Sequence, residues 1–274
     1  MTKSKRTALW IFFLLVACVQ LFPLVWLTDF SLVESSEFFS EKVLVWPDSI
    51  KWDNYINAWV DGNFLHYLWN SVFVSFVTIV LTVIVSISMA YAFTRMNWKW
   101  RPFFYAVILL GIMIPIHATL LPNFSIFKSL GLTNSYWGLI LPYTSVSVPF
   151  STFILTGFMR SIPVEIEESG VMDGASIYRI VFQLILPLTM PAVVTVAVTT
   201  FLNCWNEFIM AYTFISDERF KTLPFSVMNF AGQYSSDYGS QFAVMVLTSI
   251  PAIIIYAMFN EKITKGVMAG AVKG

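Results

Sequence analysis

The chain has 274 residues, of which 57% are apolar and only 12% are charged, and its mean hydropathy is +0.72. Soluble domains carry roughly 25% charged residues, so this composition leaves too little polar surface for a water-soluble globule and predicts an integral membrane protein. The formal net charge is zero, so overall charge gives no reason to expect a nucleic-acid partner.

Positive charge precedes the first apolar run. Lys3, Lys5 and Arg6 lead into an uncharged stretch at residues 7–28. A cleaved signal peptide has a shorter apolar region and a small-residue cleavage site, whereas about 20 apolar residues are needed to cross the hydrocarbon core. We therefore expect a retained transmembrane helix over residues 8–29.

Five further uncharged stretches are long enough to cross the membrane once, and none is long enough to cross twice. The sequence therefore predicts an all-α integral membrane protein with six transmembrane helices, forming a single domain in the cell membrane. The fifth helix is expected to continue past Glu207 toward Phe214. The expected spans are residues 8–29, 67–94, 102–124, 137–160, 184–213 and 239–261.

The distribution of charge predicts the orientation of these helices. With the N-terminus inside, eleven of the sixteen Lys and Arg residues lie on the cytoplasmic side, and seven acids gather in the first external loop. Cytoplasmic loops of membrane proteins carry the excess of Lys and Arg. The N- and C-termini are therefore both expected to be cytoplasmic.

Two external segments, residues 30–65 and 215–237, are large enough to present a surface. The first is rich in aromatic residues, which favours an aromatic belt at the membrane interface. The alternative is a docking surface for an external partner. The aromatic residues are Trp46, Trp52, Tyr55 and Trp59.

The loop between the fourth and fifth spans, at residues 163–176, is acidic on the side of the membrane where bases normally gather. Glu165, Glu167 and Glu168 favour the positive end of a helix dipole. Pro163 suits a first helical turn, and Gly174 permits the turn that ends the helix. A short helix is marginal in water, so we expect it to dock on a partner; the alternative is a solvated acidic loop.

This loop and the residues after it resemble the EAA signature of bacterial ABC-importer permeases, E-A-A-x3-G-x9-I-x-L-P. The spacing matches throughout, and the matching positions are Glu168-Ser169-Gly170, Gly174 and Leu184-x-Leu186-Pro187. Ser169 and Gly170 replace the two alanines, and Leu184 replaces isoleucine. These exchanges conserve size or polarity, although Gly170 costs up to about 1 kcal/mol of helix stability.

Further motifs resemble the carbohydrate-uptake permeases of the maltose-permease type, and the resemblance covers residues 54–274. These motifs are Asn70-Ser71, Ala90-Tyr91-Ala92 with Arg95, Leu130-Gly131-Leu132, Asp173-Gly174-Ala175, Trp205-Asn206-Glu207, Thr222-Leu223-Pro224 and the ending Ala269-Gly270-Ala271-Val272-Lys273-Gly274. The resemblance implies a type I ABC importer permease that moves a sugar or oligosaccharide by alternating access.

The same resemblance implies partners and contact residues. The partners are a second permease subunit, forming a heterodimer, a cytoplasmic ATPase dimer and an extracytoplasmic solute-binding protein. The 163–176 segment would couple to the ATPase, and the C-terminal tail would reach it as well. The implied coupling residues are Glu165, Glu167, Glu168, Ser169, Gly170, Met172, Asp173, Gly174 and Ala175, and those of the tail are Val272, Lys273 and Gly274.

No G-x4-G-K-[ST] phosphate-binding loop occurs in the sequence. The chain is therefore expected to be a transport subunit and not an enzyme, and to bind no cofactor, with ATP and Mg²⁺ held by the partner ATPase. Two histidines without a Cys/His spacing pattern predict no metal site. The alternative functions are an ABC permease for a polyamine, a phosphate or an amino acid, and an ion-coupled carrier, which needs several intramembrane ionisable groups.

Glu207 is an acid inside an apolar run, so it should face protein or water and not lipid. With Asn203 and Asn206 it offers hydrogen-bonding groups, and Trp205 offers an aromatic plane, which together suit a sugar. A role in the translocation pathway and a role in joining or capping helices are equally consistent with this pattern.

Overall fold

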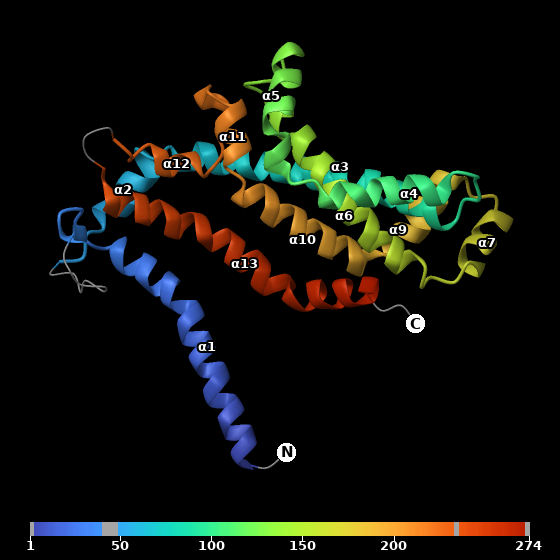
Figure 1. Ribbon diagram of the computed structural model, residues 1–274, viewed down its shortest axis with the longest axis horizontal. Coiled ribbons are helices and arrows are strands. Elements are labelled where there is room, and N and C mark those ends of the chain that lie inside the picture. The colour runs from blue at the N-terminus through green and yellow to red at the C-terminus, as the bar shows by residue number, and fades with distance from the viewer. Residues whose placement is uncertain (1–2, 40–48, 233–235, 272–274) are drawn as a thin grey trace. The chain divides into compact units, whose positions relative to one another are not determined.

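The structure is a computed structural model that describes residues 3–39, 49–232 and 236–271 (Figure 1). Helices make up its regular structure, and the only pairing of extended backbone in these ranges is an isolated bridge between Ala231 and Ser236. The prediction of an all-α membrane protein is confirmed.

Four helices are long and apolar enough to cross a membrane by themselves. They are α1 (Lys3–Phe30), α3 (Phe64–Thr94), α6 (Trp137–Met159) and α13 (Tyr238–Ala271). Two bent pairs of helical segments bring the number of possible spans to six within the described residues. The third and fifth expected spans are therefore bent helices.

The first bent pair turns by 96° at Pro115. Before the bend lie α4 (Arg101–Leu110) and the 3-10 turn η2 (Gly111–Met113), and after it η3 (Ile116–Thr119) and α5 (Leu120–Ser129). Ile114 is extended, with ψ at 112°, because a following proline disfavours the helical conformation. By contrast, α6 continues through Pro142 and Pro149 without a break.

The second bent pair turns by 82° at Thr189, between Pro187 and Pro191. It comprises α8 (Ile177–Arg179), the π-helical turn η4 (Ile180–Ile185), α9 (Leu186–Leu188) and α10 (Met190–Asn206). Proline lacks the amide proton for the helical bond and displaces the carbonyl four residues earlier, which favours a π-turn and a break. The Thr189 hydroxyl donates to the carbonyls of Ile185 and Leu186 at 3.0 Å, which also accept from the Thr189 backbone amide.

The sequence predicts that the fifth helix continues past Glu207 toward Phe214, but the structure breaks it at Glu207. Helix α10 ends at Asn206, Glu207 is extended, and a separate helix α11 (Ile209–Phe214) follows. No proline causes this break, so composition alone did not reveal it. Its cause is the side chain of Glu207, described below.

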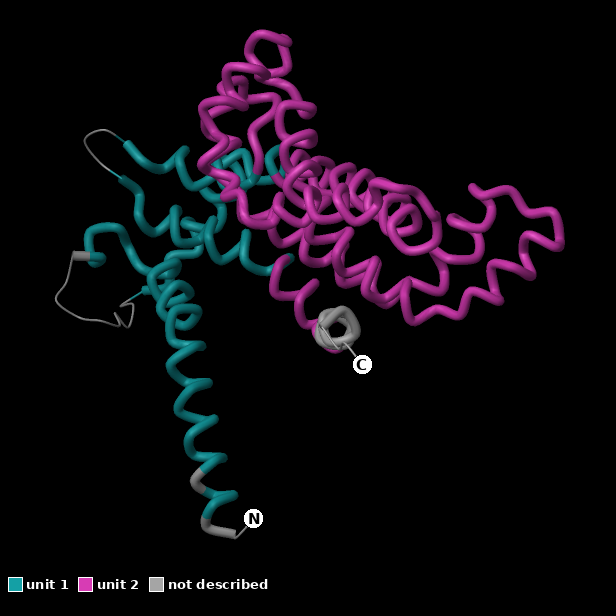
Figure 2. Tube along the Cα trace, turned by 45° about the vertical axis from the view of Figure 1, so that its right-hand side comes forward, with its two compact units in different colours: residues 1–67, 223–251 teal, residues 68–222, 252–274 magenta. Residues whose placement is uncertain are grey.

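The chain forms two compact units (Figure 2), of which the first comprises residues 1–67 and 223–251. Phe30 and Val33, at and after the end of α1, pack with Phe38 of η1 (Glu37–Phe39) and with Phe242 of α13. Helices α2 (Asp53–Val60) and α12 (Phe225–Met228) join α13 in a second cluster. Asn54 of α2 donates to the carbonyls of Ser31 and Val33, which ties α2 to the end of α1.

Asp237 fixes the N-terminal end of α13 within this first unit. Its carboxylate accepts hydrogen bonds from the hydroxyl of Ser35, at 2.7 Å, and from the hydroxyl of Ser240. Burial by itself would raise the pKa of Asp237, but these hydrogen bonds outweigh burial and hold its pKa below the usual value. The ionised carboxylate is therefore part of the folded structure at neutral pH.

The second unit, residues 68–222 and 252–274, contains the core in which α3, α6 and the bent fifth span meet. Asn70, a fully buried residue near the start of α3, joins several segments at one end of this unit. The Asn70 side-chain amide accepts from the Tyr136 hydroxyl at 2.8 Å and donates to the carbonyls of Arg219, inside the turn η5 (Glu218–Phe220), and of Lys221, directly after it. These bonds hold the segment after α11 against the ends of α3 and α6.

Candidate functional site

The acidic loop predicted to couple the protein to a partner contains a short helix, α7 (Glu165–Met172). Pro163 lies two residues before this helix and not in its first turn. Gly174 has φ at +79°, a left-handed conformation that glycine adopts without steric cost, and the chain turns there toward α8. We call residues 163–179 the coupling segment.

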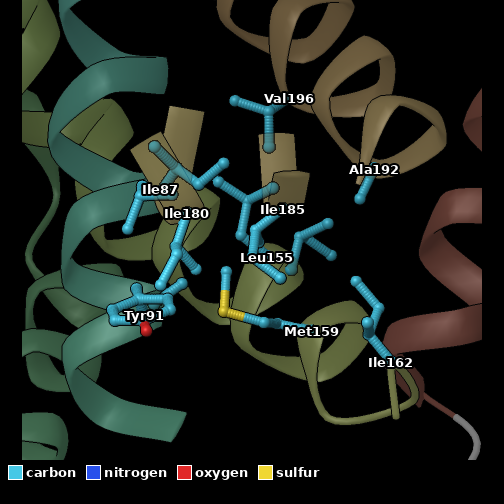
Figure 3. Packing of buried hydrophobic residues seen from close by; sticks show 12 residues of the cluster. Ile87, Tyr91, Leu155, Met159, Ile162, Ile180, Ile185, Ala192 and Val196 are labelled. Carbon is cyan, nitrogen blue, oxygen red and sulfur yellow. The ribbon is translucent and has the colours of Figure 1, made fainter. Parts of the chain in front are cut away.

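The inner side of the coupling segment is part of the main hydrophobic core of the second unit. Figure 3 shows Ile87 and Tyr91 of α3 packed with Leu155 and Met159 of α6, with Ile162 directly before the segment, and with Ile180 and Ile185 after it. From the segment itself, Ile166 and Ala175 pack against the same cluster. Burial on one face therefore fixes α7 to the ends of α3 and α6.

A buried ion pair reinforces this packing. Arg95, directly after α3, donates from Nε to Oε1 of Glu167 at 2.6 Å, and the two side chains are only 11% and 7% exposed. Of the three glutamates in the first turn of α7, Glu165 and Glu168 are exposed and Glu167 alone turns inward. Glu167, which the family resemblance assigned to ATPase contact, thus bonds within the chain.

The outer side of the coupling segment is apolar and uncovered. Met172 is 88% exposed and Tyr178 is 75% exposed, next to the exposed apolar side chains Val164, Val171 and Ile177. Glu165, Glu168, Ser169 and Asp173 of the same segment are also exposed. A cluster of large apolar side chains rimmed by polar ones is typical of a protein–protein contact.

Gly170 explains why this position of the signature takes a small residue. A Cβ added there would lie 2.7 Å from Cδ1 of Leu184, which is itself a residue of the signature. The glycine, the leucine and the spacing between them therefore describe one packing contact between α7 and the π-turn.

A groove whose lining mixes apolar and polar residues lies between α6 and α10. Two adjoining hollows, of about 490 Å³ and 320 Å³, share Val146, Ser147 and Asn203. The remaining polar lining comes from His117, Tyr143, Ser151, Thr199, Thr200, Cys204, Asn206 and Glu207. Hydroxyl and amide groups along a groove in an apolar helix bundle suit a polar, uncharged ligand.

Glu207 both lines this groove and caps α11. Its carboxylate accepts from the backbone amides of Met210 and Ala211, at 2.7 and 3.2 Å, and from the Tyr143 hydroxyl at 2.5 Å. A carboxylate at this place satisfies the free amides of the first helical turn. This cap accounts for the break between α10 and α11 and joins it to α6.

The other residues predicted for the pathway divide into two groups. Asn203 and Asn206 are exposed and line the groove. Trp205 is only 2% exposed and stacks on Phe201, at 5.0 Å between ring centroids, so its ring does not face the groove. Val272, Lys273 and Gly274 lie outside the described residues.

Sequence reasoning missed the contribution of α6 to the groove. Tyr143, Ser147 and Ser151 are four residues apart and therefore share one face of the helix. This spacing is a signal that could have found them. Arg95 was noted only as the end of a motif, because nothing in the sequence shows which acid it reaches.

A comparison with known protein families identifies the family to which the chain belongs. The description "Binding-protein-dependent transport system inner membrane component" matches residues 82–268, which include the coupling segment and the groove. The chain belongs to this family. Its members are membrane subunits of ABC transporters and not the catalytic ones, so this protein is a multi-pass permease subunit of the cytoplasmic membrane.

Several characterised or named permeases are similar over most of their length. The probable ABC transporter permease protein YurM of Bacillus subtilis is 34% identical, over 98% of this chain and 89% of that protein. The sulfoquinovosyl glycerol transport system permease protein of Agrobacterium fabrum is 32% identical, over 93% and 89%. The trehalose transport system permease protein of Mycobacterium tuberculosis is 30% identical, over 99% of both.

The fold also matches a solved structure. The crystal structure of a bacterial ABC transporter involved in the import of the acidic polysaccharide alginate gives a TM-score of 0.81, at 21% identity, over 95% of this chain and 98% of that chain. This likeness confirms the predicted ABC importer permease fold.

We predict that the stability of variants at position 170 depends on the size of the new side chain. At position 174 it should depend on whether the new residue can adopt a positive φ. Gly170→Ala should be tolerated, because the terminal methyl of Leu184 can move, whereas Gly170→Phe should prevent α7 from packing. At Gly174 nothing lies within 4 Å of an added Cβ. There Gly174→Asn should be milder than Gly174→Val, since asparagine accepts positive φ.

Thermal unfolding of the four purified variants in detergent measures this prediction. We expect Gly170→Ala to stay within about 1 kcal/mol of the parent protein. We expect Gly170→Phe to lose more than about 2 kcal/mol, as overpacked cores do. Equal stability of the alanine and phenylalanine variants at 170 would contradict the contact with Leu184.

Proposed function

We propose that this chain is the permease subunit of an ABC importer that moves a sugar or oligosaccharide into the cell. The observation that carries the proposal is the two-sided coupling segment. Its inner side is packed into the transmembrane core, and its outer side presents exposed apolar residues that need a partner. The partner is a cytoplasmic ATPase dimer, which supplies ATP and Mg²⁺.

The groove between α6 and α10 forms one wall of the translocation pathway, and a second permease subunit supplies the opposite wall. Asn203, Asn206, Ser147 and Ser151 offer neutral hydrogen-bonding groups to the hydroxyls of a sugar. Glu207 shapes this wall by holding α11. Its carboxylate accepts hydrogen bonds from two backbone amides and from the Tyr143 hydroxyl. The two permease subunits are different chains that form a heterodimer.

The orientation follows from this assignment. The coupling segment, both termini and the tail residues Val272, Lys273 and Gly274 face the cytoplasm and the ATPase. The segments 30–65 and 215–237 face outside, where a solute-binding protein delivers the sugar.

ATP-driven closure of the ATPase dimer moves the coupling segment and opens the groove outward, and hydrolysis restores the inward-facing state. The coupling requires that ATP and the loaded binding protein each bind one state more tightly.

The substrate class is supported by the groove and by relatives whose names specify sulfoquinovosyl glycerol and trehalose. We predict that uptake by vesicles holding the assembled importer is driven by a carbohydrate-loaded binding protein. Thermal-shift screening of that protein should find a sugar and no polyamine, phosphate or amino acid. A shift with one of these three and none with sugars would identify the alternative permease class.

We predict that charge on the outer side of the coupling segment prevents ATPase binding. Met172→Glu and Tyr178→Glu place a carboxylate in a contact that excludes water, which costs about 2 kcal/mol or more each. The assay is co-purification of the ATPase with the tagged permease, followed by sugar uptake. Both should fall at least about tenfold, since about 1.4 kcal/mol corresponds to tenfold in an equilibrium constant.

Ser161→Glu is the matched control, because Ser161 is exposed beside the segment and outside its apolar cluster. This variant should retain the ATPase. Retention of the ATPase by Met172→Glu together with Tyr178→Glu would overturn the assignment of this surface.

A further inference from the structure

We infer that Arg95 is the positioning residue that makes the coupling segment move together with α3 and α6, and that Glu167 is its partner in this task. The inference rests on the proposed function, in which the segment transmits force from an ATPase. It concerns a different step, the transfer of that force from α7 to the membrane helices.

The guanidinium of Arg95 joins three elements. It follows Thr94, the last residue of α3, and its own amide still bonds to the Tyr91 carbonyl at 2.9 Å. Its Nε donates to Glu167 of α7 at 2.6 Å. Its Nη2 donates to the carbonyls of Met159 and Ile162, at 3.1 and 2.6 Å, where α6 ends.

The placement of both charges also suits the helix ends. A cation at the carboxyl ends of α3 and α6 meets the negative ends of their dipoles, and Glu167 lies in the first turn of α7, at its positive end. The Tyr91 side chain of α3 also interacts with Glu167. The pair is therefore held from each element that packs around it.

The hydrogen bonds of Arg95 restrict the direction in which α7 can move relative to α3 and α6. The apolar contacts around it, such as those of Ile162 and Ile166, resist separation of the elements, but they permit sliding because the hydrophobic effect has no preferred direction. A planar guanidinium with three buried acceptors fixes both distance and angle. A displacement of α7 is then passed on to the ends of α3 and α6 without slippage.

This role predicts uncoupling and not loss of the partner. In Arg95→Gln and Glu167→Gln the outer side of the coupling segment, with Met172 and Tyr178, stays in place, so the ATPase still binds. The force it delivers is lost in local movement of α7. Sugar transported per ATP hydrolysed should therefore fall, whereas a merely structural role would lower transport and hydrolysis in proportion to the amount of assembled complex.

The test uses the complete importer in proteoliposomes, with uptake and ATP hydrolysis measured on the same preparation and normalised to co-purified ATPase. We expect the ratio of transport to hydrolysis to fall about tenfold or more in Arg95→Gln and Glu167→Gln, because each exchange leaves one member of a buried ion pair without its charged partner. Arg95→Lys should lie between these variants and the parent, because lysine keeps the charge but not the planar fork. The double exchange Arg95→Glu with Glu167→Arg should recover part of the ratio lost in the single variants.

Arg160→Gln is the matched control. Arg160 is an exposed arginine at the same end of α6, and its guanidinium lies 5.9 Å from the centre of the Tyr105 ring. Its ratio should equal that of the parent. An unchanged ratio in Arg95→Gln, or a proportional loss of transport and hydrolysis in Arg95→Lys and in the double exchange, would overturn the inference. Failure of the parent protein to bind the ATPase would instead overturn the proposed function.

Discussion

The coupling segment is folded by contacts on one face only, which leaves its other face exposed. A helix of eight residues with three glutamates in its first turn has little stability of its own in water. It forms here because Ile162, Ile166 and Ala175 enter the core and because Glu167 finds Arg95. The same arrangement leaves Met172 and Tyr178 outside, so the force that folds the segment also determines which residues a partner can reach.

The groove depends on breaks in helices that the membrane would otherwise favour as continuous spans. Prolines account for the bends at Pro115 and near Thr189, and at the second bend the Thr189 hydroxyl donates to two backbone carbonyls. The break at Glu207 has a different origin, because a carboxylate there satisfies the first amides of α11 and the Tyr143 hydroxyl. Polar groups are thereby brought to one wall between α6 and α10, among the apolar residues of the same groove.

The sequence was sufficient for features that depend on composition and local spacing. Hydropathy identified the helical membrane class, and the interval from Glu168 to Pro187 identified the coupling segment and its glycine turn. It was not sufficient for features that depend on which helices meet. The inward turn of Glu167 depends on Arg95, and the capping role of Glu207 involves Tyr143, each more than 60 residues away along the chain. The burial of Trp205 is likewise not visible in hydropathy.

The central claim is that the outer side of the coupling segment is covered by a cytoplasmic ATPase, and cysteine labelling tests it most directly. Met172→Cys, placed in a chain with Cys18 and Cys204 replaced by serine, is exposed to a membrane-impermeant maleimide in inverted membrane vesicles. The account predicts rapid labelling without the ATPase and strong protection when the purified ATPase is added back. Labelling from the outer face of intact cells, or equal labelling with and without the ATPase, would contradict it.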